Sequence, residues 1–218
     1  MNSPAEDYHM HSLTYSDGLH TIDEIVQMAP KFWLKKIAIT DHSQAVLEAQ
    51  GLALKCWRST LKHWKNYYNE VEVIFGVEGD LLDEEGNCCF EIHRQESDFR
   101  ILSLHSATYQ GDLKRVTQSY LNAISKYHEQ IDLIGHPFYT KTCEFLEVES
   151  FVDCLNQYGI PLEIDTAYLR KERTDLNKLK YALEHLETGV YVNSDMHTFG
   201  DWEQRKAGFE LLEKRGFL

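Results

Sequence analysis

Six of the eleven histidines in this chain lie at or just after the ends of short apolar runs, and carboxylates stand at similar positions. The groups concerned are His9 with His11, Asp41 with His42, Glu78, His105, His136, and Asp195 with His197. Imidazole and carboxylate together suit zinc, manganese or iron, and no cysteine is placed to compete for such an ion. These residue types therefore predict a divalent metal centre.

The spacing within two of these groups supports that prediction. Alternate residues of a strand point to the same face, so His9 and His11 are expected to reach one ion, and Asp195 and His197 share the same spacing. The carboxylate of Glu78 is placed to bridge two ions. A single histidine at a strand end is more often a hydrogen-bonded structural residue, so the prediction rests on the whole set.

These groups need a scaffold that brings strand ends together. The β-like runs are Asp7–His11, Lys36–Asp41, Val71–Glu78, Arg100–His105, Ile131–His136, Ile160–Asp165 and Gly189–Asp195. The helix-like stretches between them are Thr21–Leu34, Ala45–Glu70, Asp112–His128, Glu147–Tyr158, Asp175–Glu187 and Asp201–Lys214. Thr21 and Glu24 form a capping-box pattern, and Pro30 is expected to kink or split the helix that they open. Within Leu81–Ser97, residues 83–87 predict a turn between two short strands.

Repeated strand–helix alternation predicts an α/β fold with a parallel sheet and right-handed crossovers. A closed barrel and an open doubly wound sheet both fit this count of elements. No Gly-rich phosphate loop follows the first run, so a nucleotide-binding Rossmann fold has no support. In a parallel barrel the carboxyl ends of the strands meet on one face, which would bring the ligand-type residues into one cleft.

Length and composition limit the alternatives. The chain has 218 residues without a linker or repeat, so a single domain over residues 1–218 is expected. The formal net charge of −13 argues against stable nucleic-acid binding and against an anionic membrane as partner. No run of about 18 apolar residues predicts a membrane span. Five cysteines without a Cys-x-x-Cys pair, and an acidic start without a secretory signal, indicate a cytoplasmic protein with reduced thiols.

The ligand-type groups stand in motifs that resemble the PHP family, named for polymerase and histidinol phosphatase. The matching motifs are His9-Met10-His11, Ser16-Asp17-Gly18, Ile39-Thr40-Asp41-His42-Ser43, Gly76-Val77-Glu78-Gly79-Asp80, Ser103-Leu104-His105, Gly135-His136-Pro137 and Asn193-Ser194-Asp195-Met196-His197. They come in the family's order and cover nearly the whole chain. The resemblance implies a distorted (β/α)7 TIM-like barrel with two to three divalent ions at its carboxyl-terminal face.

The resemblance also implies which residues hold each ion. The ligands would be His9, His11, Glu78 and Asp195 for the first ion, Glu78, His105 and His136 for the second, and Asp17, His42 and His197 for the third. Some family members have histidine at the place of Asp17, and an oxygen ligand there would weaken or change the third ion. Glu78, Asp195 and His197 are the expected catalytic members of the set.

The activity implied by the resemblance is hydrolysis of a small phosphate monoester, with histidinol phosphate as a candidate. Two ions about 3.5–4 Å apart would share a hydroxide that attacks phosphorus in line, without a phosphoenzyme. Arg170 is the first candidate for contact with the phosphate, because an arginine follows a similar stretch in the histidinol-phosphatase branch. Asp165 stands here in place of the more usual asparagine. Lys171, Arg205 and Lys141 are further candidates.

Three other functions stay open. A phosphodiesterase or nuclease of the same superfamily would act on nucleotides or short oligonucleotides. An amidohydrolase also begins with His-x-His in a barrel, but the Thr-Asp-His and Ser-Asp-x-His pairings fit it poorly. A non-catalytic metal-binding domain would lose ligands, whereas every ligand-type position is filled here.

Several residues have structural roles as their simplest interpretation. Asp41 either orients a ligand histidine or ends its strand on the solvent side. The aromatic residues of the long predicted helix are expected to pack in the core: Trp57, Trp64, Tyr67 and Tyr68. The remaining histidines are expected to be structural or exposed: His20, His63, His93, His128 and His185.

Overall fold

Short strands form two sheets in the computed structural model, which describes residues 1–52, 70–92, 97–214 and 216. The first sheet is parallel and has the order β1 (Glu6–Asp7), β2 (Lys36–Ile39) and β3 (Glu72–Phe75). The second has the order β5 (Cys88–Cys89), β4 (Val77–Leu81), β6 (Arg100–Ser103), β7 (Leu133–Ile134), β8 (Leu162–Asp165) and β9 (Val190–Asn193). In this second sheet β5 is antiparallel to β4, and the other pairs are parallel. The predicted α/β class and parallel pairing are confirmed.

One predicted strand, Val71–Glu78, is divided between the two sheets at Gly76. The amide of Gly76 donates to Ile39 O at 2.8 Å, whereas the amide of Val77 donates to Phe99 O at 2.9 Å. A Cβ atom at Gly76 would lie 2.7 Å from Phe99 O, which is closer than any side chain tolerates. Glycine therefore allows the chain to leave β2 and pair with β6 without a break.

Isolated bridges connect the two sheets at the edge where the ligand-type residues lie. Met10 pairs in parallel with Met196, and His42 pairs in parallel with Glu78. The first contact is held by the amide of His11, which donates to Met196 O at 2.8 Å. The regular ladders of the described strands do not by themselves close into one ring. Closure into a (β/α)7 barrel therefore stays a prediction.

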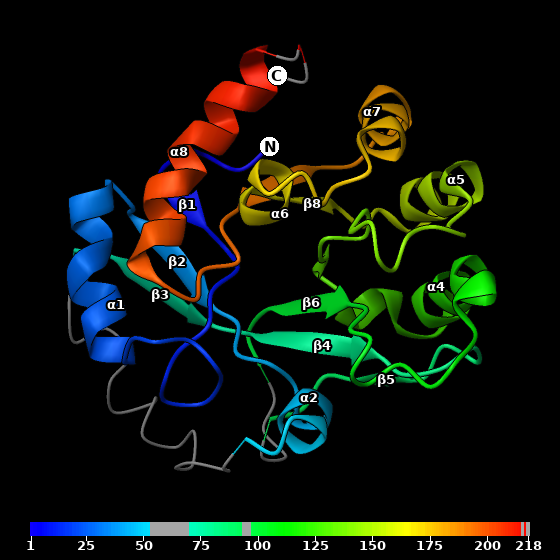
Figure 1. Cartoon of the computed structure of the whole chain (residues 1–218), viewed down its shortest axis with the longest axis horizontal. Coiled ribbons are helices and arrows are strands. Elements are labelled where there is room, and N and C mark those ends of the chain that lie inside the picture. Colours follow the sequence, from blue (N-terminus) through cyan, green and yellow to red (C-terminus); the bar gives the residue numbers. More distant parts are fainter. Residues whose placement is uncertain (53–69, 93–96, 215, 217–218) are drawn as a thin grey trace.

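Helices connect the strands and cover the sheets. The α-helices of the described residues are α1 (Ile22–Met28), α2 (Gln44–Ala49), α4 (Val116–Tyr127), α5 (Val148–Tyr158), α6 (Thr166–Arg170), α7 (Leu176–His185) and α8 (Phe199–Lys214). The 3-10 helices are η1 (Ala29–Phe32), η2 (Leu113–Arg115) and η3 (His128–Gln130). Figure 1 shows α1 and α8 beside the first sheet, with α4, α5 and α7 along the side of the second. Among the described helices, none is long and apolar enough to cross a membrane.

Local signals set most helix limits as predicted. Thr21 Oγ1 accepts from the amide of Glu24 at 3.3 Å, and Glu24 Oε2 accepts from the amide of Thr21 at 2.8 Å. This capping box begins α1, and the following 3-10 helix contains Pro30. The short helix α6, which directly follows β8, was not predicted. It begins because Asp165 accepts the amides of Ala167 and Tyr168, at 2.7 and 3.2 Å.

The predicted helix Ala45–Glu70 begins as expected, but the prediction that it continues past Ala49 is wrong. α2 stops at Ala49, and Gly51 has a φ of +66°, which ends a helix rather than continuing it. The residues of this stretch that lie outside the described part of the chain include Trp57, His63, Trp64, Tyr67 and Tyr68. His93 also lies outside it.

The two largest hydrophobic clusters of the described residues hold most of the strands in place. The larger packs the second sheet against α4, α5 and α7 and includes the fully buried Phe151. The smaller packs the first sheet against α1 and α8 and includes Ile25 and Trp202. Burial of one large apolar side chain contributes about 1.5–3 kcal/mol, so these clusters fix the strand ends that carry the polar groups. The remaining described histidines make aromatic contacts outside those groups, as predicted: His20 with Phe199, His128 with Tyr158 and His185 with Tyr181.

Candidate metal centre

The buried carboxylate of Glu78 lies at the centre of the histidine cluster. Its side chain is 1% exposed. The histidine nitrogens within 3.5 Å of its oxygens are His9 Nε2, His11 Nε2, His42 Nδ1, His105 Nε2 and His136 Nε2. The shortest distances are 2.8 Å from Oε1 to His136 and 2.9 Å from Oε2 to His42. The two oxygens therefore face different histidines, which is the arrangement that a bridging carboxylate needs.

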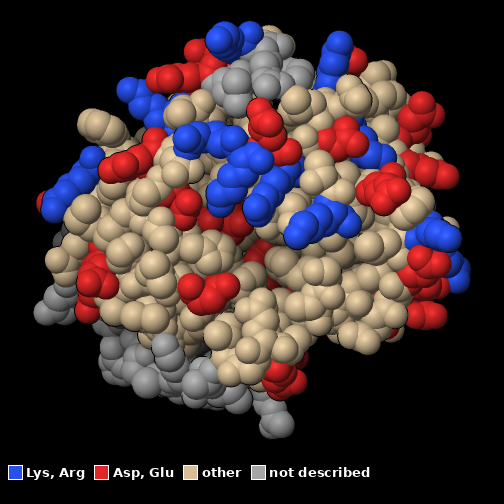
Figure 2. All heavy atoms as spheres, viewed as in Figure 1, with Lys and Arg blue, Asp and Glu red and all other residues tan. Residues whose placement is uncertain are grey.

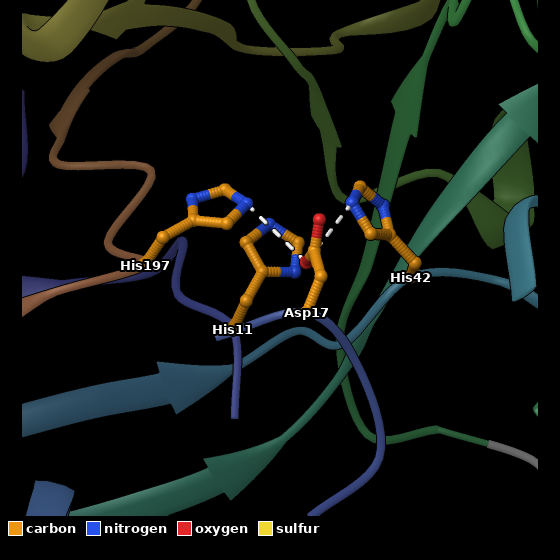
Figure 3. A group of neighbouring side chains, drawn as sticks. All are labelled: His11, Asp17, His42 and His197. Atoms are coloured by element: carbon orange, nitrogen blue, oxygen red, sulfur yellow. Dashed lines mark ion pairs between the residues drawn. The ribbon is translucent and has the colours of Figure 1, made fainter. Parts of the chain in front are cut away.

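A second group surrounds Asp17 on the more open side. Figure 3 shows His42 and His197 directed toward the carboxylate of Asp17 from opposite sides, with His11 close by. Asp17 Oδ1 lies 3.3 Å from His197 Nε2 and 3.5 Å from His42 Nε2. The side chains of Asp17 and His197 are 31% and 34% exposed, so solvent reaches the centre from this side.

Asp195 completes the set together with the first two histidines. Its Oδ1 lies 3.1 Å from His11 Nε2 and 3.5 Å from His9 Nε2. The donor atoms of these three residues lie within 4.8 Å of one another, as do those of His42, Glu78 and His105. The structure therefore brings all nine predicted ligand residues into one centre. It groups them somewhat differently from the prediction, because His11 also joins the Asp17 group and His42 also joins the Glu78 group.

Two of the nine predicted ligand residues have a strained backbone conformation, which sets the direction of their side chains. His136 has a φ of +27° and Asp195 a φ of +47°, a region that residues with a Cβ atom rarely adopt. Such conformations cost on the order of 1–3 kcal/mol and persist where the surroundings hold them. The amide of His136 donates to Glu163 Oε2 at 2.8 Å. The amide of Met196, next to Asp195, donates to His9 O at 3.2 Å.

The contacts within the centre shift its protonation equilibria. Burial disfavours the charged form of His42, but the carboxylates of Glu78 and Asp17 raise its pKa to about 9. Burial likewise opposes a charge on His197, but Asp195 and Asp17 raise its pKa to about 10. Burial acts to raise the pKa of Glu78, yet the surrounding histidines hold it well below its usual range. In the absence of ions, protons thus compensate the buried carboxylates.

Buried polar atoms in the centre fit bound cations. His9 Nε2, His42 Nδ1 and Glu78 Oε2 are buried and make no hydrogen bond within the described chain, although His42 Nδ1 and Glu78 Oε2 lie 2.9 Å apart. Buried polar atoms are normally hydrogen-bonded, so three such atoms that lie close together are positioned to bind a common ligand. Imidazole nitrogen and carboxylate oxygen are the donors that zinc, manganese and iron accept. These clusters can therefore hold metal ions.

The profile of the PHP domain family matches residues 7–167. The chain belongs to the PHP family. A probable phosphatase of Thermoanaerobacter sp. strain X514 is 28% identical to this PHP protein over 217 residues, which cover 96% of this chain and 86% of the relative. The DNA polymerase/3'-5' exonuclease PolX of Bacillus subtilis is 26% identical over 220 residues, which cover 95% of this chain and 37% of PolX.

A solved PHP-like structure has the same overall fold. It is the crystal structure of histidinol phosphate phosphatase from Lactococcus lactis, complexed with zinc, L-histidinol and phosphate. The TM-score is 0.54 at 15% identity, and the match covers 94% of this chain and 92% of that chain. At this identity the likeness supports the fold alone.

Two carboxylates that the sequence analysis did not single out position histidines of the PHP centre. Glu163 Oε1 accepts from His9 Nδ1 at 2.8 Å, and Asp80 Oδ1 accepts from His105 Nδ1 at 2.8 Å. Each contact places the ring proton on Nδ1, so Nε2, which faces Glu78, presents its lone pair to a cation. Both lie on buried strands, β8 and β4, and buried carboxylates on apolar strands are the signal that could have found them.

Of the two roles predicted for Asp41, the structure favours orienting a ligand histidine, which it does through the backbone. Its Oδ1 accepts the amide of Ser12 at 2.6 Å, and its Oδ2 accepts the Ser12 hydroxyl at 2.8 Å. The side chain is buried, so it does not end its strand at solvent. It holds the turn that follows His11 and thereby positions that histidine through the backbone.

The prediction that Arg205 binds substrate is wrong. Its side chain is buried, and its Nη1 donates to Pro4 O at 2.9 Å while its Nε donates to Val192 O at 3.2 Å. Its Nη2 donates to Glu6 O and Val192 O. Because these carbonyls occupy the guanidinium, it ties the amino-terminal segment to β9 instead.

Arg170 and Lys171, two of the three other predicted substrate contacts, remain available. Arg170 ends α6 and Lys171 follows it, and both side chains are exposed. Figure 2 shows Lys and Arg side chains gathered over α6 and the loop after it, beside a hollow in which Asp and Glu lie deeper.

Proposed function

We propose that this PHP protein hydrolyses a small phosphate monoester at a centre of two to three divalent ions, zinc, manganese or iron. The observation that carries the proposal is the bridging geometry of Glu78, whose two oxygens face different histidines of the cluster. The proposed scaffold is one domain with the distorted (β/α)7 barrel of the family. Bound divalent ions would supply a nucleophile by lowering the pKa of water and would offset charge on the phosphate.

The protein's own groups have distinct proposed roles. His9, His11 and Asp195 would hold one ion, and His105 and His136 another, with Glu78 shared between them. A third ion would be held by Asp17, His42 and His197. Glu78, Asp195 and His197 are the proposed catalytic members of the set: Glu78 lies at the centre of the cluster, and the side chains of Asp195 and His197 are 11% and 34% exposed. Glu163 and Asp80 keep the ligand rings oriented.

Substrate would enter from the exposed side of Asp17 and His197. Arg170 and Lys171 are proposed to contact the phosphate oxygens that face solvent, since guanidinium and ammonium groups bind phosphate well. Histidinol phosphate is the first candidate substrate. It is supported by the likeness in fold to the Lactococcus lactis enzyme, which was solved with L-histidinol and phosphate. The likeness to PolX favours a second candidate, a phosphodiesterase that acts on nucleotides or short oligonucleotides.

The test is phosphate release with added Mn²⁺ from L-histidinol phosphate, an aryl monoester and an aryl diester at matched concentrations. Phosphatase function predicts turnover of the monoesters, and a kcat/KM for histidinol phosphate far above that of the aryl ester would identify the substrate. Glu78→Gln should abolish turnover, whereas the exposed Glu149→Gln serves as a matched control. Preference for the diester would favour the second candidate, and no turnover at full metal occupancy would overturn both.

A further inference from the structure

Four exposed cations lie on two short segments that follow β7 and β8. They are Lys141, Arg170, Lys171 and Arg173. Figure 2 shows the basic side chains over this part of the molecule as a cluster at the edge of the hollow. The chain as a whole carries a formal charge of −13, so this edge differs in sign from the protein average. We call these four residues the basic rim.

The backbone holds the two segments of the basic rim against each other. The amide of Thr140 donates to Arg173 O at 2.8 Å, and Tyr139 pairs in antiparallel fashion with Thr174. Lys141 and Arg173 are therefore held close by main-chain contacts. Glu172, the acidic residue within this segment, is exposed and has a φ of +55°, in a turn that ends α6.

Aromatic contacts connect the basic rim to the metal centre. The ring of Tyr168 lies 5.4 Å from the ring of His136 and stacks on the ring of Tyr139 at 4.4 Å. Arg170 follows Tyr168 by two residues, and Lys141 follows Tyr139 by two. Two ring contacts thus connect the segments that carry the rim to His136, a proposed metal ligand.

Within the described residues, no ion pair gives the basic rim an acidic partner. The Lys and Arg ion pairs found within the described residues are Lys36–Glu72, Arg115–Glu84, Lys180–Glu184 and Arg205–Asp7. None of them includes a rim residue. Like charges held close together repel, so a group of cations without a counter-charge favours binding of an anion. Arg170 and Lys171 are the proposed contacts of the phosphate at the metal centre. Lys141 and Arg173 therefore remain for a second anionic group.

We propose that Lys141 and Arg173 bind a second phosphate on the leaving-group side of the substrate. The preferred substrates are then small phosphate monoesters that carry another phosphate, and this inference rests on the proposed function. The reaction itself is unchanged: water oxygen bonds to phosphorus, the bond from phosphorus to the leaving-group oxygen breaks, and that oxygen takes up a proton. The second phosphate is bound and is not cleaved in the same event.

The experiment compares kcat/KM for fructose 1,6-bisphosphate and fructose 6-phosphate, with the metal-loaded protein. Either phosphate of the first probe can react, so a ratio of about two is statistical. Wild-type protein should exceed this ratio about tenfold, because each exposed charge contact contributes up to about 1 kcal/mol. The double variant Lys141→Gln/Arg173→Gln should lower the ratio to about two, and added salt should also lower it.

The control is Lys35→Gln/Lys180→Gln, which removes the same charge from exposed positions outside the basic rim and should leave the ratio unchanged. An equal ratio in wild type and the Lys141→Gln/Arg173→Gln protein would overturn the proposal, as would a statistical ratio in wild type. An aryl monophosphate separates the two levels of inference. If wild type hydrolyses it without preferring the bisphosphate, the basic rim proposal alone fails; if wild type hydrolyses none of the three, the proposed function fails.

Discussion

Glu163→Gln is the substitution that most directly tests how the centre is held. Three donors point at this carboxylate, which is buried on β8. His9 Nδ1 and Asn193 Nδ2 each donate to Oε1 at 2.8 Å, and the amide of His136 donates to Oε2 at 2.8 Å. An amide of the same shape has one oxygen and one NH₂ group. Either orientation therefore sets a donor against a donor.

The two orientations have different consequences for the metal ligands. With the new NH₂ group facing His136, that histidine's buried amide loses its acceptor, at a cost of about 1–3 kcal/mol. With the NH₂ group facing His9, the imidazole proton moves to Nε2, the atom that faces Glu78 at 3.4 Å. A protonated Nε2 cannot bind a cation. Loss of such an orienting contact typically lowers metal affinity 10–100-fold, or by about 1.4–2.7 kcal/mol.

The assay is a competition titration of Mn²⁺ or Zn²⁺ against a chromogenic chelator, together with phosphate release as a function of metal concentration. The Glu163→Gln protein should need more metal to reach half-maximal activity and should regain much of its activity at saturation. Glu149→Gln, an exposed change of the same type on α5, is the matched control. An apparent metal Kd unchanged by Glu163→Gln, in a protein that stays folded by circular dichroism, would refute the role assigned to Glu163.

Two further predictions concern pH and stability. The pKa values of His42 and His197 are raised from 6.5 to about 9 and about 10, so both rings stabilise the metal-free fold below about pH 6.5 and lose this effect as pH rises through those values. Metal affinity should therefore rise with pH from neutral toward pH 9, with protons released on binding; calorimetric titrations in two buffers of different ionisation enthalpy would measure this, and binding without proton release would contradict it. Arg205→Leu leaves the buried Asp7, 3.7 Å away, without its cation, and should lower the free energy of unfolding by about 3–5 kcal/mol. Urea unfolding measures that loss, and a change below about 1 kcal/mol would show that the guanidinium does not hold the amino-terminal segment.

Much of the centre was open to prediction because its ligands follow simple spacing rules. His9 and His11 are two residues apart on extended backbone, and His136 directly follows a short apolar run. Parallel strands place such ends at one edge, whatever the packing beneath them. The positioning carboxylates Glu163 and Asp80 were not predicted, because a carboxylate on a buried strand has no local partner that would mark it.

The sequence by itself determined most of the element types, the start of α1 at its capping box, and the set of residues that could ligate a metal. These depend on local backbone geometry and on alternation along a strand. Tertiary structure alone decided which donor faces which oxygen of Glu78, where Gly76 passes between sheets, and that Arg205 lies buried among carbonyls. Those outcomes depend on strand register and helix packing, which join residues far apart in the chain and leave no local pattern.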